Sequence, residues 1–260
     1  MKAVQGNGVQ TTKANKYTFD NTGRRAEARY RQLSRLYDAN TIRHIEQRGI
    51  ERGWSCLEIG GGGGSVALWL CARVGDTGRV LATDIDPLLL RSWPYKNLEV
   101  WRHDIRTEGL PREEFHLAHA RLVLLHLPDR QVAMGRMIDA VKPGGWVVVE
   151  EFDALTFLLE PAVNPGEATL RELKANGLVQ VGVEATGSFW GGKSAGTELM
   201  KLNFEEMREP MISSGLISQE EFEADLRRIH EPSPIMWTAW GRKPGFQAKP
   251  PAASDDFIPW

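Results

Sequence analysis

The stretch Leu57-Glu58-Ile59-Gly60-Gly61-Gly62-Gly63-Gly64-Ser65 decides the fold of this chain. It ends a short apolar strand, predicted over 54–59, and leads into residues 65–74, which are apolar enough for a buried helix. Glycine adopts positive φ and lets a ligand approach the backbone closely. Each glycine also costs conformational entropy on folding, and a simple turn would not require five of them. Ligands of open α/β sheets bind at this end of a strand. The stretch therefore predicts a loop that binds a nucleotide-type cofactor.

Strands and helices alternate along the rest of the chain. Helical spacing is found over 24–38 and 41–48, with Asn40 expected to cap the second helix, and Asp86-Pro87 is expected to begin another. Apolar runs predict strands over 79–83, 98–102, 115–120 and 146–149. Beyond residue 151 we expect a helix, an edge strand, two helices and a closing strand, over 166–176, 178–184, 198–214, 219–230 and 234–241. This alternation implies right-handed crossovers and a mostly parallel sheet with helices on both faces.

Composition narrows the class of protein. The 260 residues carry 32 basic and 34 acidic side chains in mixed order, so the charge offers no reason to expect nucleic acid or an anionic membrane as partner. No apolar run reaches 18 residues and the first residues are polar, which predicts a cytoplasmic protein without a signal peptide. The two cysteines lack paired spacing, and no cluster has the spacing of metal ligands, so we expect neither a disulfide framework nor a metal.

Acidic residues stand at the ends of predicted strands, where they could contact a cofactor. Asp84 ends the second strand, 20 residues beyond Gly64, where an acid accepts hydrogen bonds from ribose hydroxyls. This spacing alone fits an NAD enzyme as well as one other cofactor class. Further details favour the second class: Glu58 precedes Gly60 by two residues, and three motifs follow at intervals. These motifs are His103-Asp104-Ile105, the run from Ala118 to Asp129 after the fourth strand, and Lys142-Pro143-Gly144-Gly145-Trp146.

Together these motifs resemble those of class I S-adenosylmethionine-dependent methyltransferases, in the group that modifies small molecules in actinobacterial natural-product pathways. The resemblance covers about residues 30–151, and residues 178–242 are also similar to actinobacterial members. It implies an α/β fold, a three-layer αβα sandwich with a seven-stranded, mostly parallel Rossmann-like sheet and one antiparallel strand. We also expect an N-terminal helical segment over 1–50 that covers the site and a methyltransferase domain over 51–242 with a lid and substrate region near 152–230. The proline-rich stretch over 243–260 is expected to be a flexible tail.

The resemblance also assigns cofactor contacts. Gly60, Gly62 and Gly64 would let the backbone approach the methionine moiety and the ribose, with Glu58 beneath them. Asp84 would accept from both ribose hydroxyls. The remaining implied contacts are Ile85 and Ile105 beside the adenine, Asp104 on its amino group, Arg121 at the methionine end, and Tyr37 as a cover from the N-terminal helices, a role open to Tyr17 and Tyr30 as well. Gly61 and Gly63 depart from the family pattern and suggest a more flexible loop.

The acceptor side is harder to predict. His126 and Glu151 follow the fourth and fifth strands, where this fold places its substrate cleft, and each is a candidate base. A histidine bonded to the backbone and a capping carboxylate are the alternatives. Phe189 and Trp190 suggest an aromatic lid over the substrate within a glycine-rich loop. We expect methyl transfer from S-adenosylmethionine to a small, hydrophobic molecule, leaving S-adenosylhomocysteine, with alignment and water exclusion as the main protein contributions.

Other functions stay open at this point. A nicotinamide dehydrogenase would need a hydride-transfer site such as Tyr-x-x-x-Lys, which is absent. A methyltransferase acting on protein or RNA would usually carry a basic groove or a further binding domain. A non-catalytic scaffold that binds the cofactor, as one subunit of an oligomer, is a third alternative. Methylation at carbon, oxygen or nitrogen is not distinguished, nor is assembly into a homo-oligomer.

Overall fold

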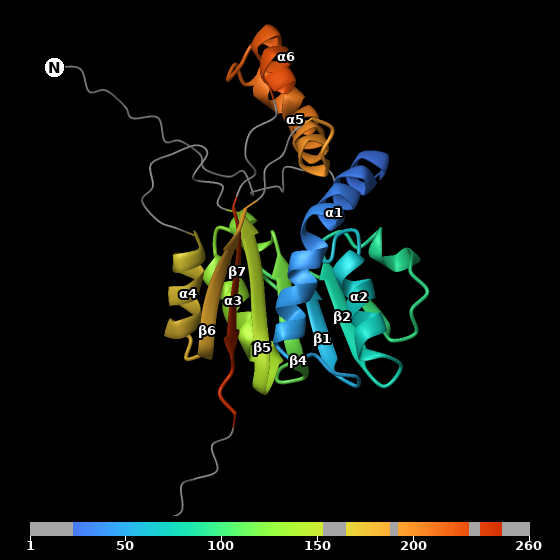
Figure 1. Cartoon of the computed structure of the whole chain (residues 1–260), viewed down its shortest axis with the longest axis vertical. Helices are drawn as coiled ribbons and strands as arrows, with labels where there is room; N and C mark the ends of the chain where they lie inside the picture. The colour runs from blue at the N-terminus through green and yellow to red at the C-terminus, as the bar shows by residue number, and fades with distance from the viewer. Residues whose placement is uncertain (1–22, 153–164, 188–191, 229–234, 246–260) are drawn as a thin grey trace, which may run out of the picture.

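A seven-stranded sheet forms the centre of the computed structural model, which describes residues 23–152, 165–187, 192–228 and 235–245 (Figure 1). Its strand order is β3-β2-β1-β4-β5-β7-β6, and β7 is antiparallel to both of its neighbours while the other strands are parallel. The strands are β1 Ser55–Ile59, β2 Arg79–Asp84, β3 Leu98–Arg102, β4 Phe115–Arg121, β5 Val141–Phe152, β6 Val179–Thr186 and β7 Met236–Arg242. The predicted sheet with one antiparallel strand is confirmed.

Helices cover both faces of the sheet because the buried strands are apolar on both sides. Leu57 and Ile59 of β1 pack with α3, whereas Cys56 packs with α2. The helices are α1 Gly23–Gln47, α2 Ser65–Val74, α3 Arg130–Ala140, α4 Pro165–Ala175, α5 Ala195–Ser213 and α6 Gln219–Arg228, with short 3-10 turns η1 Leu90–Ser92 and η2 Leu124–His126. Among these helices, none combines the length and the hydropathy of a membrane-crossing segment.

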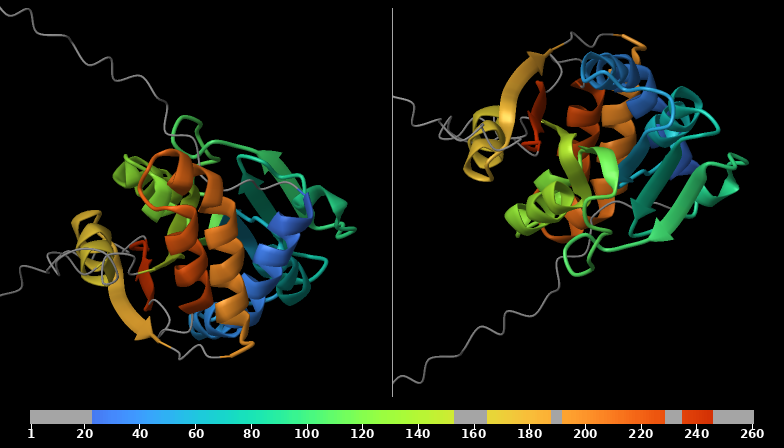
Figure 2. Two further views of the ribbon diagram at one scale, coloured as in Figure 1. Left: turned by 90° about the horizontal axis from the view of Figure 1, so that it is seen from above. Right: turned by 90° about the horizontal axis from the view of Figure 1, so that it is seen from below.

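A group of helices stands beyond the carboxyl edge of the parallel strands. It consists of α5, α6 and the first half of α1, which lie side by side in Figures 1 and 2. The Nη1 of Arg29 lies 2.7 Å from Oε2 of Glu206, and both side chains are largely buried. Phe222 of α6 is fully buried and its ring centroid lies 6.2 Å from that of Phe204. We call this group the helical cap, since it covers the sheet edge at which the glycine loop lies.

Two local predictions were wrong. The helices predicted over 24–38 and 41–48 form the single helix α1, because Asn40 caps nothing: its amide donates to Oγ1 of Thr238 at 3.2 Å and its oxygen accepts from Arg43 at 2.8 Å. The helix expected after Asp86-Pro87 is only the turn η1. The amide of Asp86 donates to Asp84 at 2.9 Å, so this segment folds back on the end of β2.

Candidate active site

The glycine loop between β1 and α2 has a backbone that only glycine adopts without strain at several positions. Gly60, Gly62 and Gly64 have φ of +66°, +50° and +86°. The amides of Gly60 and Gly61 donate to the carbonyl of Thr83 at 2.8 and 3.0 Å. The loop is therefore folded against the carboxyl end of β2, which brings it next to the acid that ends this strand.

Asp84 joins the glycine loop to the segment after β2. Its Oδ2 accepts from the amide of Gly62 and its Oδ1 from the amide of Asp86, both at 2.9 Å. Burial raises the pKa of this carboxyl above its usual range, against the effect of the amide donors. The adjacent Ile85 is 45% exposed, which leaves an apolar surface beside a buried acid. Such a pair suits a sugar with two hydroxyls that carries a flat ring.

Tyr30 of α1 lies on the glycine loop. A Cβ added to Gly62 would lie 2.5 Å from Cε1 of Tyr30, and one added to Gly63 would lie 2.7 Å from its Cβ. A Cβ added to Gly61 would meet Leu90 of η1 at 3.0 Å. The additional glycines at 61 and 63, which suggested a flexible loop, thus allow two other segments to pack tightly against it.

Three ionisable side chains form a buried row beneath the loop. Nδ1 of His119 lies 2.7 Å from Oε2 of Glu58, and Nε2 of His119 lies 3.3 Å from Oε2 of Glu150. Burial alone would lower the pKa of His119, but the two carboxylates outweigh it and raise this pKa to about 9. Glu150 has its pKa lowered to about 2, because His119, Arg121 and Thr41 outweigh the effect of burial. The histidine is therefore an imidazolium between two carboxylates at neutral pH.

Arg121 links the end of β4 to α1 and α2. Its Nη1 donates to Oδ1 of Asp38 at 2.9 Å and to Oγ1 of Thr41 at 3.0 Å. The hydroxyl of Ser65, the first residue of α2, donates to the same oxygen of Asp38 at 3.1 Å. The side chain of Arg121 therefore forms hydrogen bonds with other residues of the protein, and these bonds hold α1 against the end of the glycine loop.

The other predicted cofactor residues lie in varied surroundings. The carboxylate of Asp104 is paired with Arg106 at 2.7 Å, whose hydrogen bonds lower the pKa of Asp104. Ile105 is buried in the core. Tyr37 is 6% exposed, its ring centroid lies 5.3 Å from that of Phe152, and its hydroxyl has no hydrogen-bond partner among the described residues. Burial raises the pKa of Tyr37. The roles predicted for these residues stay predictions.

The two candidate bases differ in their contacts. Glu151 is buried, and its carboxylate accepts from the amides of Leu124 at 2.9 Å and Leu125 at 3.2 Å, which holds the turn η2. Burial raises the pKa of Glu151 to about 7 although these amides oppose it. His126 ends η2 at the surface, and desolvation together with Arg29 lowers its pKa. Tyr17, Phe189 and Trp190 lie outside the described residues.

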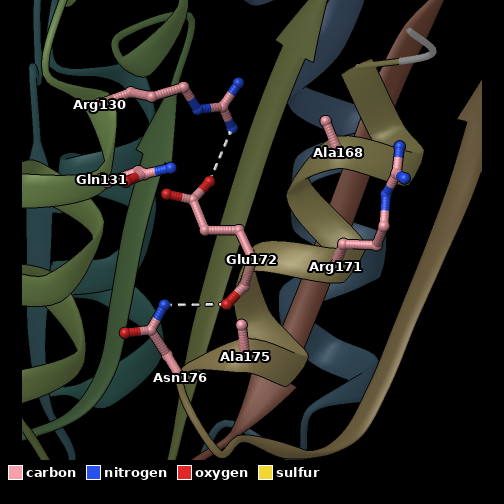
Figure 3. Close-up of a pocket in the computed structure, with 7 residues that line it drawn as sticks. All are labelled: Arg130, Gln131, Ala168, Arg171, Glu172, Ala175 and Asn176. Atoms are coloured by element: carbon pink, nitrogen blue, oxygen red, sulfur yellow. Dashed lines mark hydrogen bonds and ion pairs between the residues drawn. The ribbon is translucent and has the colours of Figure 1, made fainter.

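A groove of about 510 Å³ lies between α3 and α4, away from the glycine loop (Figure 3). At its centre Arg130 and Glu172 are paired at 3.2 Å. It is lined by Arg130, Gln131, Ala168, Arg171, Glu172, Ala175 and Asn176. None of the residues predicted to bind cofactor or substrate lines it. Within the described ranges, no three His, Cys, Asp or Glu side chains are grouped so that they could hold a metal ion.

Sequence reasoning missed the partners of Glu58. His119 and Glu150 lie in β4 and β5 beside buried apolar residues such as Ala118, Ala120 and Val149. A histidine and a glutamate within such strands are a signal, because buried ionisable groups require partners. The partners come from other strands and from α1, so only the register of the sheet identifies them.

Known proteins resemble the chain in sequence. A family model described as a methyltransferase domain matches residues 26–204. Methyltransferase str2 of Strobilurus tenacellus is 39% identical over 103 residues, 37% of this chain and 35% of that protein. The ubiquinone/menaquinone biosynthesis C-methyltransferase UbiE of Enterobacter sp. (strain 638) is 29% identical over 116 residues, 42% of this chain and 46% of that protein. The matches thus span less than half the length of these two relatives.

Solved structures share the fold. Phosphoethanolamine N-methyltransferase 2 of Haemonchus contortus, in complex with phosphomonomethylethanolamine and S-adenosylhomocysteine, aligns with a TM-score of 0.52 at 16% identity, covering 80% of this chain and 53% of that one. A SAM-dependent methyltransferase of Aquifex aeolicus aligns with a TM-score of 0.53 at 14% identity, covering 85% and 99%. Since the family model spans more than half of the 260 residues and the sheet has the matching order, the chain belongs to the methyltransferase domain family and has its class I, Rossmann-like fold.

Proposed function

We propose that the chain transfers a methyl group from S-adenosylmethionine to a small, apolar organic molecule. The observation that carries this proposal is the glycine loop held against Asp84 at the carboxyl ends of the adjacent strands β1 and β2. The cofactor, when bound, supplies a methyl group activated by the positive charge of its sulfonium. The family match and the complex with S-adenosylhomocysteine named above support this choice of donor over a nicotinamide cofactor.

The residues present fit this cofactor. Cβ atoms at Gly60 or Gly62 would lie 2.4 Å from Val123 and 2.5 Å from Tyr30, so only glycine lets these two side chains pack on the loop that is proposed to hold the cofactor. Asp84 offers an acceptor for ribose hydroxyls, and Ile85 an apolar surface for the adenine. The side-chain hydrogen bond of Glu58 among the described residues runs from Oε2 to His119, and Oε1 is proposed as the acceptor for the α-amino group.

An apolar acceptor suits the hydrophobic cluster at which the sheet edge meets the helical cap. Tyr37, Leu199 and Met236 are buried there, from α1, α5 and β7. The hydrophobic residues packed around them are Leu33, Leu36, Leu122, Phe152 and Met200. These elements meet beyond β4 and β5, next to the proposed methyl donor. The relative named for ubiquinone and menaquinone biosynthesis supports an apolar acceptor, and Tyr17, Phe189 and Trp190 are proposed to contact it as well.

The protein contribution to the reaction is alignment of the acceptor with the methyl group and exclusion of water by the helical cap. A base is needed only where the nucleophile arrives protonated. His126 ends η2, and desolvation together with Arg29 lowers its pKa, which favours the neutral form that a base requires. Glu151 is the second candidate base, although both its oxygens accept backbone amides.

Calorimetry tests the proposal directly. The wild-type chain is titrated with S-adenosylhomocysteine and, in parallel, with NAD. Binding of S-adenosylhomocysteine with a Kd of about 1 to 100 µM, with no heat from NAD, is the expected result. Absence of S-adenosylhomocysteine binding would refute the function. A second assay measures transfer of a radiolabelled methyl group from S-adenosylmethionine to small aromatic acceptors, to tRNA and to protein. Label in the small acceptors alone supports small-molecule transfer. Label in tRNA or protein indicates a macromolecular substrate, and no transfer to any acceptor indicates a non-catalytic scaffold.

A further inference from the structure

The buried row Glu58–His119–Glu150 has a regular place in the sheet. Glu58 and His119 are register neighbours on β1 and β4, and Thr238 of β7 is the register neighbour of Glu150 on β5. All four side chains lie on the face covered by α1. Glu58, His119 and Glu150 are 3%, 0% and 0% exposed. Two buried carboxylates on either side of one imidazole are stable only if each is paired and hydrogen-bonded.

The two ends of the row differ in how completely they are satisfied. Glu150 accepts from Thr238 at 2.9 Å, from Thr41 and from Asn40, besides its contact with His119. Both of its oxygens are therefore used within the protein. The side chain of Glu58 has only the contact between Oε2 and His119 among the described residues. The row thus has one closed end inside the sheet and one open end beneath the glycine loop.

The same network reaches the far side of the glycine loop. Thr41, which donates to Glu150, also accepts from Arg121, and Arg121 donates to Asp38. Asp38 in turn accepts from Ser65, directly after the last glycine. Polar contacts through α1 thus tie together the residues before and after the loop. With His119 protonated, the five ionisable groups Asp38, Glu58, His119, Arg121 and Glu150 carry a net charge of −1, which a bound ammonium group would neutralise.

We propose that His119 is a positioning residue for the cofactor: anchored by Glu150, it holds Oε2 of Glu58 so that Oε1 accepts the α-ammonium group of S-adenosylmethionine. This inference rests on the proposed function. His119 itself touches no reacting atom. Its effect is confined to the amino-acid part of the cofactor, so a ligand that lacks this part is the appropriate control.

Two amide substitutions divide the contacts of His119. In His119→Asn the side-chain nitrogen stands near the position of Nδ1 and still donates to Glu58. In His119→Gln it stands near the position of Nε2 and donates to Glu150 instead. Both variants lose the same charge. We expect His119→Asn to bind S-adenosylhomocysteine within about threefold of wild type, and His119→Gln to lose about tenfold or more, the usual size of one charge-assisted hydrogen bond.

The measurement is calorimetry with S-adenosylhomocysteine and with 5′-methylthioadenosine, which has the adenosine and sulfur but no amino-acid group. The loss in His119→Gln should appear only with S-adenosylhomocysteine. Adding Glu58→Gln should abolish the difference between the two histidine variants. Equal affinities in His119→Asn and His119→Gln, or equal losses for both ligands, would overturn the inference and leave His119 a structural residue.

If the histidine variants do not fold, Glu150→Gln is used instead: it keeps the size of the side chain and one acceptor oxygen, but it replaces the other oxygen by an NH2 group and removes the charge that anchors His119. It should also lower affinity for S-adenosylhomocysteine and spare 5′-methylthioadenosine. An unchanged affinity for both ligands would contradict the positioning role. Failure of the wild-type chain to bind S-adenosylhomocysteine would refute the proposed function instead, so the two failures are distinguishable.

Discussion

Replacing Gly62 by alanine measures how tightly α1 packs on the glycine loop. Gly62 has φ of +50°, a conformation that costs an L-residue about 1–2 kcal/mol. The new Cβ would also lie 2.5 Å from Cε1 of Tyr30. The ring cannot easily move away, since its own Cβ is already packed against Gly63. Overpacking of this kind adds about 1–3 kcal/mol, so Gly62→Ala should lower the free energy of unfolding by about 2–5 kcal/mol.

Gly49 provides the matched control. It has φ of +77° at the end of α1, but a Cβ there would meet nothing within 4 Å. Gly49→Ala therefore carries the conformational cost alone, about 1–2 kcal/mol. Unfolding in urea gives the difference between the two variants, and Tyr30→Ala in the Gly62→Ala background should recover the steric part. If Gly62→Ala costs no more than Gly49→Ala, or if Tyr30→Ala recovers nothing, Tyr30 does not pack tightly on Gly62.

Three further perturbations test the site. Asp84→Asn should weaken binding of S-adenosylhomocysteine by about 1–3 kcal/mol in calorimetry, with the neighbouring Asp86→Asn close to wild type; equal effects would mean that Asp84 does not contact the ribose. The pKa of His119 is raised from 6.5 to about 9, so its contribution to stability is complete below pH 6.5 and is lost as the pH rises through 9. The free energy of unfolding should therefore fall over this pH range in wild type and change less in His119→Gln. Identical pH profiles of the two proteins would contradict the charged pairing. Glu151→Gln removes the carboxylate and keeps one acceptor oxygen for the two backbone amides of η2, so its free energy of unfolding is measured alongside its activity. With stability unchanged, kcat should fall at least about tenfold if Glu151 is a base, whereas a similar fall in His126→Gln alone would assign that role to His126.

Much of the fold follows from local sequence. The run from Leu57 to Ser65 has an apolar strand before it, glycines with positive φ within it and an apolar helix after it, and each of these properties is a matter of neighbouring residues. The strands β1 to β4 and the helix α2 lie where hydrophobic runs predicted them. A prediction from local propensity was wrong at Asn40, because an asparagine side chain can either cap a helix or bond to a distant strand. Asn40 is a common cap, but here its side chain reaches Thr238 on a strand 198 positions away along the chain.

The sequence by itself determined that a parallel sheet presents a glycine loop and Asp84 at one edge, because strand periodicity and glycine conformation depend on adjacent residues. Only the tertiary structure decided what surrounds them: Tyr30 on Gly62, Arg121 on Asp38, and His119 between Glu58 and Glu150. These contacts join segments up to 83 residues apart along the chain. Their partners are set by sheet register and by the docking of α1, and a buried charge in the sequence states only that a partner must exist.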